Sequence, residues 1–472
     1  MAKLVIGLVC MRADNFDGGT ARNFSESVQK MEALAGEYDY DFFYYPEPVL
    51  TPEDAAAAAA MVKERGADFL MIQITSFPSG EAFIRLAKSC GRIGIWGLPE
   101  SSFEGSNFVN SNNSFCGVNM ACSIVKNYLK NLKIEYKWFF GYGGSEQFRR
   151  RFSLTARALS VIKKLASSRV ALVGGIAPGF NDLYYDERLG TALLGVDIQR
   201  GHEFSEIYSR AHSYRDSEIE ELAVGYACAR CASDVRKEDL CIAARYYKAY
   251  KEFAAEHKYD ALAVSCWPQI KTDTLACSVI GKLNQDCIPA SCEGDLPGAV
   301  SMLALHYITG APATLMDLCG VDEQDETALM WHCGPSPECF ANDGDAVTTC
   351  SYQLNLAGET IRYPLIHDLI FKPQPVTFMR FTGEWDQMFL LDGRVTDSPK
   401  ASPSGSRGWI GGLRLNGKPV LTMDLVNTIL TNGFQHHYPM TAGDVSPVCM
   451  EIASWLGIGL MRKIECEDYR QS

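Results

Sequence analysis

Short apolar runs alternate with stretches of helical periodicity through the first part of the chain. Buried strands are predicted at the runs LVIGLVCM, DFFYYP, ADFLMIQI and RIGIWGLP, with a helix over residues 23–38 between the first two. A second helix is predicted to begin at Pro52, because Thr51 is a good N-cap and proline suits the first helical turn. Strands that alternate with helices at this spacing predict a parallel sheet. We expect this first α/β domain to span residues 1–167.

The same alternation starts again at the run RVALVGGIAPGF. Further strands are predicted at DALAVSCWP, CIPASCEGD and APATLMDL, and helices are predicted over residues 216–234, 239–257, 275–283 and 298–308. The sequence therefore predicts a second α/β domain with a parallel sheet, over residues 168–341.

The pattern changes after residue 341. Short β-rich runs separated by Gly, Pro, Asp and Ser follow one another, namely AVTTCSYQL, ETIRYPLI, PVTFMRFTG, QMFLLDGRVTD, RGWIGGLRL and KPVLTMDLV. A closing helix is expected over residues 445–456, before a last strand at LMRKIE. We expect residues 342–472 to form an antiparallel β domain, so the fold class is α/β with a β-rich C-terminal domain.

Composition narrows the function classes. The chain has 472 residues, and its 44 basic and 57 acidic residues give a net charge of −13, so we expect no nucleic-acid partner. Its 17 cysteines show no framework spacing, which is typical of a reducing compartment, and we expect a cytoplasmic protein. No apolar stretch approaches the roughly 18 residues of a membrane helix, and the N-terminus lacks a signal-peptide cleavage site. We therefore expect no membrane partner.

Three local motifs have a structural and a functional interpretation. The stretch GGIAPG at residues 174–179 lacks the spacing of a dinucleotide-binding loop and favours a tight turn near a ligand cleft. Cys228 and Cys231 have zinc or redox spacing, but they fall in a predicted helix without a second ligand pair. The run of arginines at residues 149–151 is typical of a solvated face, although it could also contact an anion.

Two acidic residues follow successive predicted strands of the second domain, Glu293 after CIPAS and Asp317 at the end of APATLMDL. Because the carboxyl ends of neighbouring parallel strands form the ligand crevice of open α/β sheets, we expect both acids to face one pocket. His332 and the pair His436–His437 are the imidazoles that could join them. Carboxylates with imidazoles suit Mn²⁺, Zn²⁺ or Fe²⁺, and oxygen-rich sites favour Mn²⁺ or Mg²⁺. The alternative is that these polar residues are unrelated, with one acid capping a helix and His332 within a core.

The segment SCEGDLPGAVSMLALHYITGAPATLMDL, with ALMWHCG and GFQHHYPM further along, resembles the L-fucose isomerase and L-arabinose isomerase superfamily. The resemblance lies mainly within residues 287–440 and implies two Rossmann-like α/β domains with parallel sheets, followed by a β-rich antiparallel C-terminal domain. It also implies a divalent metal, usually Mn²⁺. The implied ligands are Glu293, Asp317 and His437, and His332 matches a further ligand of the arabinose-isomerase form.

The same resemblance implies an aldose–ketose isomerase that moves a proton between C1 and C2 through a cis-enediol. We expect Glu293 to be the carbon base and Asp317 its acid/base partner, with both residues also binding the metal. The expected substrate is a pentose, a 6-deoxyhexose or a 6-substituted hexose. One variant is an isomerase specific for a sulfosugar, sulfoquinovose (6-deoxy-6-sulfoglucose). The sequence is also compatible with a sugar-binding protein without catalysis, and with a metal-dependent aldolase or lyase.

The sugar hydroxyls need polar or aromatic partners. Four residues are candidates by their place at predicted strand ends or near the histidine pair: Trp96, Trp267, Gln73 and Asn432. A sulfonate needs an Arg or Lys, and Arg12, Arg22 and the arginines at 149–151 are the candidates. The resemblance further implies a homo-oligomer, a trimer or hexamer, whose pocket lies between subunits.

Overall fold

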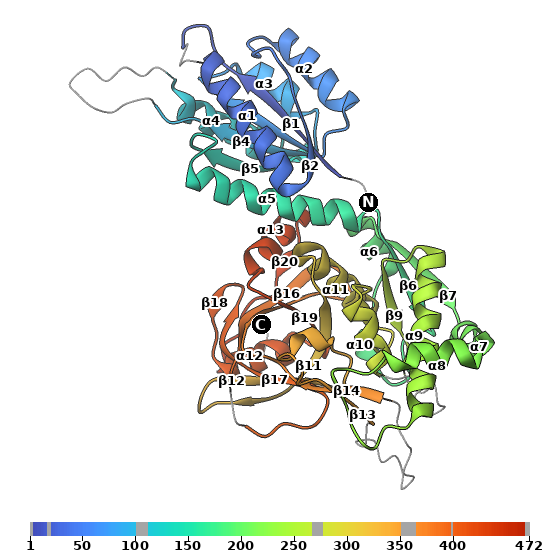
Figure 1. The fold of residues 1–472 in the computed structure, drawn as a ribbon. Coiled ribbons are helices and arrows are strands. Elements are labelled where there is room, and N and C mark those ends of the chain that lie inside the picture. The colour runs from blue at the N-terminus through green and yellow to red at the C-terminus, as the bar shows by residue number, and fades with distance from the viewer. Residues whose placement is uncertain are drawn as a thin grey trace. The chain divides into compact units, whose positions relative to one another are not determined.

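The computed structural model describes residues 3–16, 20–100, 112–266, 277–350, 365–397 and 400–467. The chain divides into two compact units, Met1–Lys163 and Lys164–Ser472 (Figure 1). Trp267 and the end of the predicted strand AVTTCSYQL lie outside the described residues. The predicted domain boundaries after residues 167 and 341 stay predictions.

The first unit is built on a five-stranded parallel sheet in the order β2-β1-β3-β4-β5. Buried residues of α2, α3 and α4 share one core with β1, β3 and β4, and aromatic side chains of α5 pack against β2 and β5. Thr51 caps α2 and Pro52 stands in its first turn, both as predicted, and Asp54 completes a capping box. The elements are β1 (Leu4–Met11), α1 (Thr20–Tyr38), β2 (Tyr40–Tyr44), α2 (Pro52–Glu64), β3 (Phe69–Ile74), α3 (Gly80–Ala87), β4 (Arg92–Gly97), α4 (Ser114–Ser123), β5 (Glu135–Phe140) and α5 (Glu146–Leu165).

The second unit begins with a four-stranded parallel sheet in the order β10-β9-β6-β7. Two helices of this part were predicted closely, α9 (Lys237–His257) and α10 (Cys277–Gln285). The other elements are β6 (Arg169–Val173), α6 (Glu187–Leu194), β7 (Asp197–His202), α7 (Phe204–Ser213), α8 (Asp216–Val224), β9 (Ala261–Val264) and β10 (Ala290–Ser291). Both parallel sheets confirm the α/β class.

Six strands of the second unit close into an antiparallel ring, in the order β16-β15-β19-β11-β12-β17 and back to β16. Closure leaves these strands without a free edge. A core of buried apolar residues from all six strands fills this part of the unit. The strands are β11 (Ala313–Asp322), β12 (Thr327–His332), β15 (Pro375–Phe381), β16 (Gln387–Val395), β17 (Ser406–Leu415) and β19 (His437–Ala442). The predicted antiparallel C-terminal sheet is therefore confirmed.

Helix α11 (Leu296–Thr309) lies between the two sheets of the second unit. It contacts β6, β9 and β10 of the parallel sheet and β11, β15 and β19 of the antiparallel ring. Most of its residues are buried, as expected for a helix that is apolar all round. The loop before α11 is thereby held where the two sheets meet.

Four predicted elements differ from the structure. The run APATLMDL does not join the parallel sheet; it is part of β11, which pairs with β12 and β19 in the antiparallel ring. The helix predicted over residues 216–234 ends at Val224, and Arg230–Cys231 forms the short strand β8. The run KPVLTMDLV gives only the two-residue strand β18 (Lys418–Pro419), followed by helix α12 (Thr422–Thr431). The closing helix is α13 (Ser446–Leu456), and the last strand is limited to β20 (Gly459–Leu460).

The remaining short strands are β13 (Val347–Cys350) and β14 (Leu365–Ile370), which pair with each other and connect β8 to β17. Across the described part of the chain, no helix is both long and apolar enough to span a membrane.

Candidate active site

Glu293 lies in the loop between β10 and α11. Its backbone φ is 61°, in the left-handed region that non-glycine residues seldom adopt and that concentrates at functional sites. The Ala177 N–H donates to the Glu293 carbonyl at 3.0 Å. At Gly294, with φ of 73°, a Cβ would lie 2.2 Å from the Gly175 carbonyl oxygen. The glycine stretch at residues 174–179 is thus a turn that supports the Glu293 loop.

Asp317 and His437 come from neighbouring strands of the antiparallel ring. They lie directly opposite each other in the β11–β19 ladder, so their side chains stand on the same face of the sheet. The Nε2 atom of His437 is 3.8 Å from Oδ1 of Asp317 and 3.4 Å from Oε2 of Glu293. The two acids therefore do meet, but by another route than predicted, because Asp317 stands in the middle of an antiparallel strand and not at the end of a parallel one.

His332 completes the group at the end of β12. Its ring lies 5.5 Å from the ring of His437, between centroids, and the candidate ligand atoms of Asp317, His332 and His437 all lie within 4.8 Å of one another. The same holds for Glu293, His436 and His437. The structure thus brings together all four residues predicted as metal ligands, and His436 with them.

Three atoms of this group have unused hydrogen-bonding capacity. Oδ1 of Asp317 and Nε2 of both His332 and His437 are buried and have no hydrogen-bond partner among the described residues. Leaving such an atom unsatisfied costs about 1–3 kcal/mol, so their convergence calls for a common partner. Carboxylate oxygens and imidazole nitrogens are ligands of Mn²⁺, Zn²⁺ and Fe²⁺. The donor set therefore fits a divalent cation.

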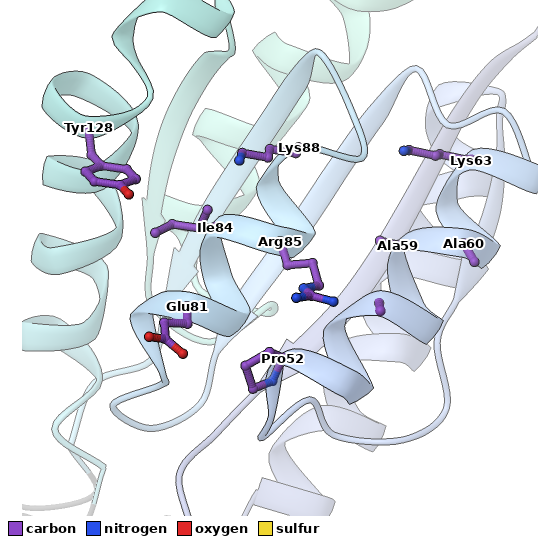
Figure 2. Close-up of a pocket in the computed structure, with 10 residues that line it drawn as sticks. Pro52, Ala59, Ala60, Lys63, Glu81, Ile84, Arg85, Lys88 and Tyr128 are labelled. Carbon is purple, nitrogen blue, oxygen red and sulfur yellow. The ribbon is translucent and has the colours of Figure 1, made fainter.

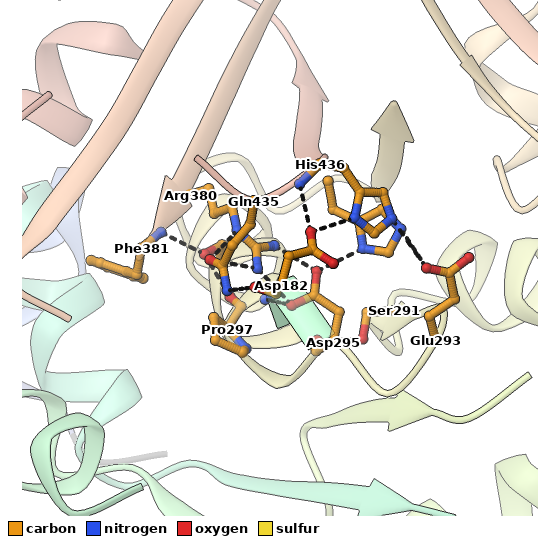
Figure 3. Close-up of polar contacts among 12 residues, drawn as sticks. Asp182, Ser291, Glu293, Asp295, Pro297, Arg380, Phe381, Gln435 and His436 are labelled. Atoms are coloured by element: carbon orange, nitrogen blue, oxygen red, sulfur yellow. Dashed lines mark hydrogen bonds and ion pairs between the residues drawn. The ribbon is translucent and has the colours of Figure 1, made fainter. Parts of the chain in front are cut away.

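The second ring nitrogen of His437 is held by Asp295. Nδ1 of His437 donates to Oδ2 of Asp295 at 3.0 Å, which leaves the Nε2 lone pair directed at the other members of the group. Asp295 also caps α11, accepting from the Gly298 N–H at 2.9 Å. Arg380 binds the Asp295 carboxylate through two contacts of 2.5 and 2.8 Å, and both side chains are fully buried. Gln435 accepts from Arg380 in turn, at 3.0 and 3.1 Å (Figure 3).

Burial alone would raise the pKa of Asp295. The Arg380 guanidinium and the His437 hydrogen bond outweigh it, so the pKa of this carboxyl lies well below its usual value. Asp295 therefore stays ionised and can hold the Nδ1 proton of His437.

His436 has a different environment from His437. Its Nδ1 contacts Oδ2 of Asp182 at 2.7 Å, and its Nε2 contacts Oε2 of Glu293 at 3.1 Å. Its side chain is 36% exposed, whereas that of His437 is fully buried. Burial lowers the pKa of His436, but hydrogen bonds to Glu293 and Asp182 outweigh it and raise the pKa to about 9. His436 therefore suits a charged partner of Glu293, and Figure 3 shows the contact between the two side chains.

Two of the predicted substrate residues lie in the core of the first unit. In the first unit, Trp96 is fully buried, stacks on Phe148 at 4.2 Å and donates to the Gly141 carbonyl, so it belongs to the core. Gln73 is also buried and donates to Ser27 at 2.6 Å.

The other polar candidates lie at the surface or at a helix end. Arg12 is 4.0 Å from Asp14, and Arg22 is 79% exposed. Asn432 in the second unit ends α12 and donates to the Thr428 carbonyl. In the arginine run, Arg149 pairs with Glu37, and Arg151 lies over Trp138.

Sequence reasoning missed Asp295, Arg380 and Asp182. Asp295 has a local signal, because an Asp before Leu-Pro-Gly is a good N-cap, but nothing in the sequence links that cap to a histidine 142 positions away. Arg380 and Asp182 have no local signal, since their partners come from distant parts of the chain.

The first unit has a surface pocket between α2 and α3. Its volume is about 750 Å³, and Lys63, Arg85, Lys88 and Tyr128 are among its lining residues (Figure 2). None of the residues singled out from the sequence as catalytic, metal-binding or substrate-binding lines it.

The chain is similar to curated enzymes named sulfoquinovose isomerase. The one from Priestia megaterium (strain ATCC 12872 / QMB1551) is 22% identical over 427 residues, which cover 88% of this chain and 90% of that protein. The one from Clostridium sp. (strain MSTE9) is 25% identical over 414 residues, 85% of this chain and 86% of that protein. The one from Alkalicoccus urumqiensis is 23% identical over 421 residues, 86% of this chain and 88% of that protein.

No protein-family model matches the chain. A solved structure that aligns with it is an ABC transporter periplasmic solute binding protein from Actinobacillus succinogenes 130z with bound D-allose, at 14% identity over 66% of this chain and 93% of that one. Its TM-score of 0.17 is too low to inform fold or function.

Proposed function

We propose that this protein is a metal-dependent aldose–ketose isomerase whose substrate is a sulfosugar, with sulfoquinovose converted to sulfofructose. The observation that carries this proposal is the similarity to enzymes named sulfoquinovose isomerase over 85–88% of the chain. The convergence of Glu293, Asp317, His332 and His437 supports it from the structure. The segments that resemble the L-fucose and L-arabinose isomerase superfamily hold these same four residues.

The proposed metal ligands are Glu293, Asp317, His332 and His437, and Mn²⁺ is the proposed metal. When bound, a divalent cation would stabilise negative charge on the two substrate oxygens and help to orient the sugar. His437 binds such a cation only as neutral imidazole, and its hydrogen bond to Asp295 selects the tautomer with a free Nε2.

The proton transfers are assigned to the two carboxylates. Isomerisation removes a proton from C2 of the aldose and returns it to C1 of the ketose, and it moves another proton between the two oxygens. Glu293 is proposed to carry the carbon-bound proton, because its carboxylate joins the group from the loop on the parallel-sheet side and its side chain keeps 14% exposure. Asp317 is proposed to exchange the oxygen-bound proton. The cis-enediol is the intermediate between removal of the proton from C2 and its return to C1.

A sulfonate needs a cation that is free to bind it. Arg380 reaches the site only through Asp295, and within the described residues its guanidinium is fully buried against Asp295 and Gln435. We therefore propose that the sulfonate partner comes from a neighbouring subunit, with Arg22, whose side chain is 79% exposed, and Arg12, whose side chain is 27% exposed, as the candidates. A homo-oligomer, trimer or hexamer, with a pocket between subunits is part of this proposal.

The test is proton NMR of the Mn²⁺-loaded protein in D₂O. Sulfoquinovose is compared with D-glucose, which has a hydroxyl in place of the sulfonate at C6, and with L-fucose, L-arabinose, D-arabinose and L-rhamnose. With sulfoquinovose we expect the C2 proton signal to disappear and ketose signals to grow. After treatment with a chelator, we expect neither change. Turnover of a neutral sugar alone would overturn the sulfosugar assignment, and no turnover of any sugar by the metal-loaded protein would overturn the isomerase.

A further inference from the structure

Four cysteines form a row of sulfur contacts beside the candidate active site. The Sγ atoms of Cys266 and Cys292 are 2.9 Å apart, and those of Cys277 and Cys333 are 3.1 Å apart. Cys292 and Cys333 also contact each other, so the row runs Cys266, Cys292, Cys333, Cys277. All four are free thiols. Cys266, Cys277 and Cys292 are buried, and only Cys333 is partly exposed.

Each close pair includes the chain neighbour of a proposed metal ligand. Cys292 directly precedes Glu293, and Cys333 directly follows His332. Nδ1 of His332 lies 2.8 Å from the backbone nitrogen of Cys333 and 3.2 Å from its Sγ atom. A movement of either sulfur is therefore transmitted to the loop or strand end that holds a ligand.

The linear arrangement favours chemistry between pairs. A single thiolate-bound metal needs its sulfurs around one centre. Among the described residues, the groups whose candidate ligand atoms lie within 4.8 Å of one another include Cys266 and Cys292 with Glu293, but none contains all four cysteines. A disulfide needs only two sulfurs, at about 2.05 Å. The observed pairs are about 1 Å from that distance.

We propose that Cys277–Cys333 and Cys266–Cys292 are reversible disulfide sites that respond to a peroxide. The sulfur of Cys333 attacks the O–O bond of hydrogen peroxide, an S–O bond forms, and the other oxygen leaves as water with the thiol proton. The sulfur of Cys277 then attacks Cys333, the S–O bond breaks, and the hydroxide leaves as water with the Cys277 proton. Two thiols are oxidised to one disulfide while one peroxide is reduced to two waters.

The buried pair is oxidised by exchange along the row. Cys292 attacks the sulfur of Cys333 and releases Cys277 as a thiol, after which Cys266 attacks Cys292 and releases Cys333 as a thiol. No further oxidant enters these two steps. A second peroxide then oxidises Cys277 and Cys333 again, so both disulfides form through the one partly exposed sulfur.

The first test reads the disulfides themselves and does not depend on the proposed function. The Mn²⁺-loaded full chain is treated with hydrogen peroxide, alkylated, and digested without reduction for mass spectrometry. We expect the cross-links 277–333 and 266–292. Cys333→Ser should remove both, Cys266→Ser should remove only the second, and the double variant Cys277→Ser with Cys292→Ser should leave a sulfenic acid on Cys333 that dimedone traps. Cys116→Ser, at an exposed thiol on α4, is the matched control and should change neither.

Formation of the 266–292 cross-link in Cys333→Ser would overturn the route through Cys333. Irreversible oxidation of Cys333 without any cross-link would show that the two cysteine pairs do not form disulfides.

The second test reads the consequence for the site, and its turnover part rests on the proposed function. Oxidation should lower Mn²⁺ affinity by about tenfold or more, as loss of groups that orient metal ligands does, and dithiothreitol should restore it. Turnover should fall and recover in parallel. Both cross-links with unchanged manganese affinity would overturn the coupling to the site. A reduced protein that turns over no sugar would instead count against the isomerase and leave the cross-link test intact.

Discussion

His437 lies directly opposite Asp317 across the β11–β19 ladder, with its Nε2 atom 3.8 Å from Oδ1 of that carboxylate. Two neighbouring strands of a closed antiparallel ring thus supply one half of the candidate site. Glu293 supplies the other half from the loop between β10 and α11. Because α11 packs on both sheets, its position sets the distance between these halves.

The two histidines of the pair should differ in their effect on metal binding. His437→Gln should lower the bound Mn²⁺ per chain strongly, because it removes a buried ligand whose Nδ1 is held by Asp295. His436→Gln should retain most of the metal, because His436 contacts Glu293 and Asp182 from a partly exposed position. Elemental analysis after dialysis measures the difference. Equal retention in both variants, or stronger loss in His436→Gln, would mean that the ligand role has been given to the wrong histidine.

Replacing each carboxylate with its isosteric amide should distinguish the role of Glu293 from that of Asp317. Glu293→Gln should lower the rate of C2 proton exchange in D₂O by about 10²–10⁴-fold, the usual contribution of a general base, while the fold is retained. Asp317→Asn should lower both that rate and the bound metal. Asp182→Asn serves as a control, because its carboxylate reaches Glu293 only through His436. Near-normal exchange in Glu293→Gln would remove this residue from the mechanism.

The hydrophobic pattern along the chain predicted most of the elements of the two parallel sheets. The alternation of strands and helices predicted both parallel sheets, since each element is specified by its own local sequence. The run APATLMDL was assigned to the wrong sheet. A short apolar strand has the same sequence pattern in a parallel and in an antiparallel sheet, so the pattern does not indicate which strands it pairs with.

The candidate site shows the same limit. The residues that converge were identified by their chemistry and by the resemblance, yet the contact of His437 with Asp295 depends on how two sheets pack on α11. The substrate residues were chosen from strand ends, and Trp96 proved to be a core residue because a strand end can face the interior as readily as a ligand. Long-range partners such as Arg380 leave no local trace in the sequence.

The Asp295–Arg380 pair should be a strong determinant of stability. Asp295→Ala should lower the free energy of unfolding by about 3–5 kcal/mol, because it leaves the Arg380 guanidinium buried without its partner. The double variant Asp295→Leu with Arg380→Met should recover part of this loss, since both charges are then removed. Urea titrations of the three proteins measure these differences. A double variant that is no more stable than Asp295→Ala would mean that the buried charge is not the cause.

The charge of His436 should make stability depend on pH in the metal-free protein. Its pKa is raised to about 9 in the folded chain, against 6.5 for an ordinary histidine, so the folded state binds this proton more tightly than the unfolded state. The resulting stabilisation is fully present below about pH 6.5 and is lost as the pH rises through about 9. The stability difference between the wild-type chain and His436→Gln, both treated with chelator, should therefore shrink over that interval. Urea titrations at several pH values measure it, and the Cε1 proton of His436 followed by NMR should titrate near pH 9. A difference that stays constant over the interval, together with a titration near 6.5, would show that Glu293 and Asp182 do not hold the proton on His436.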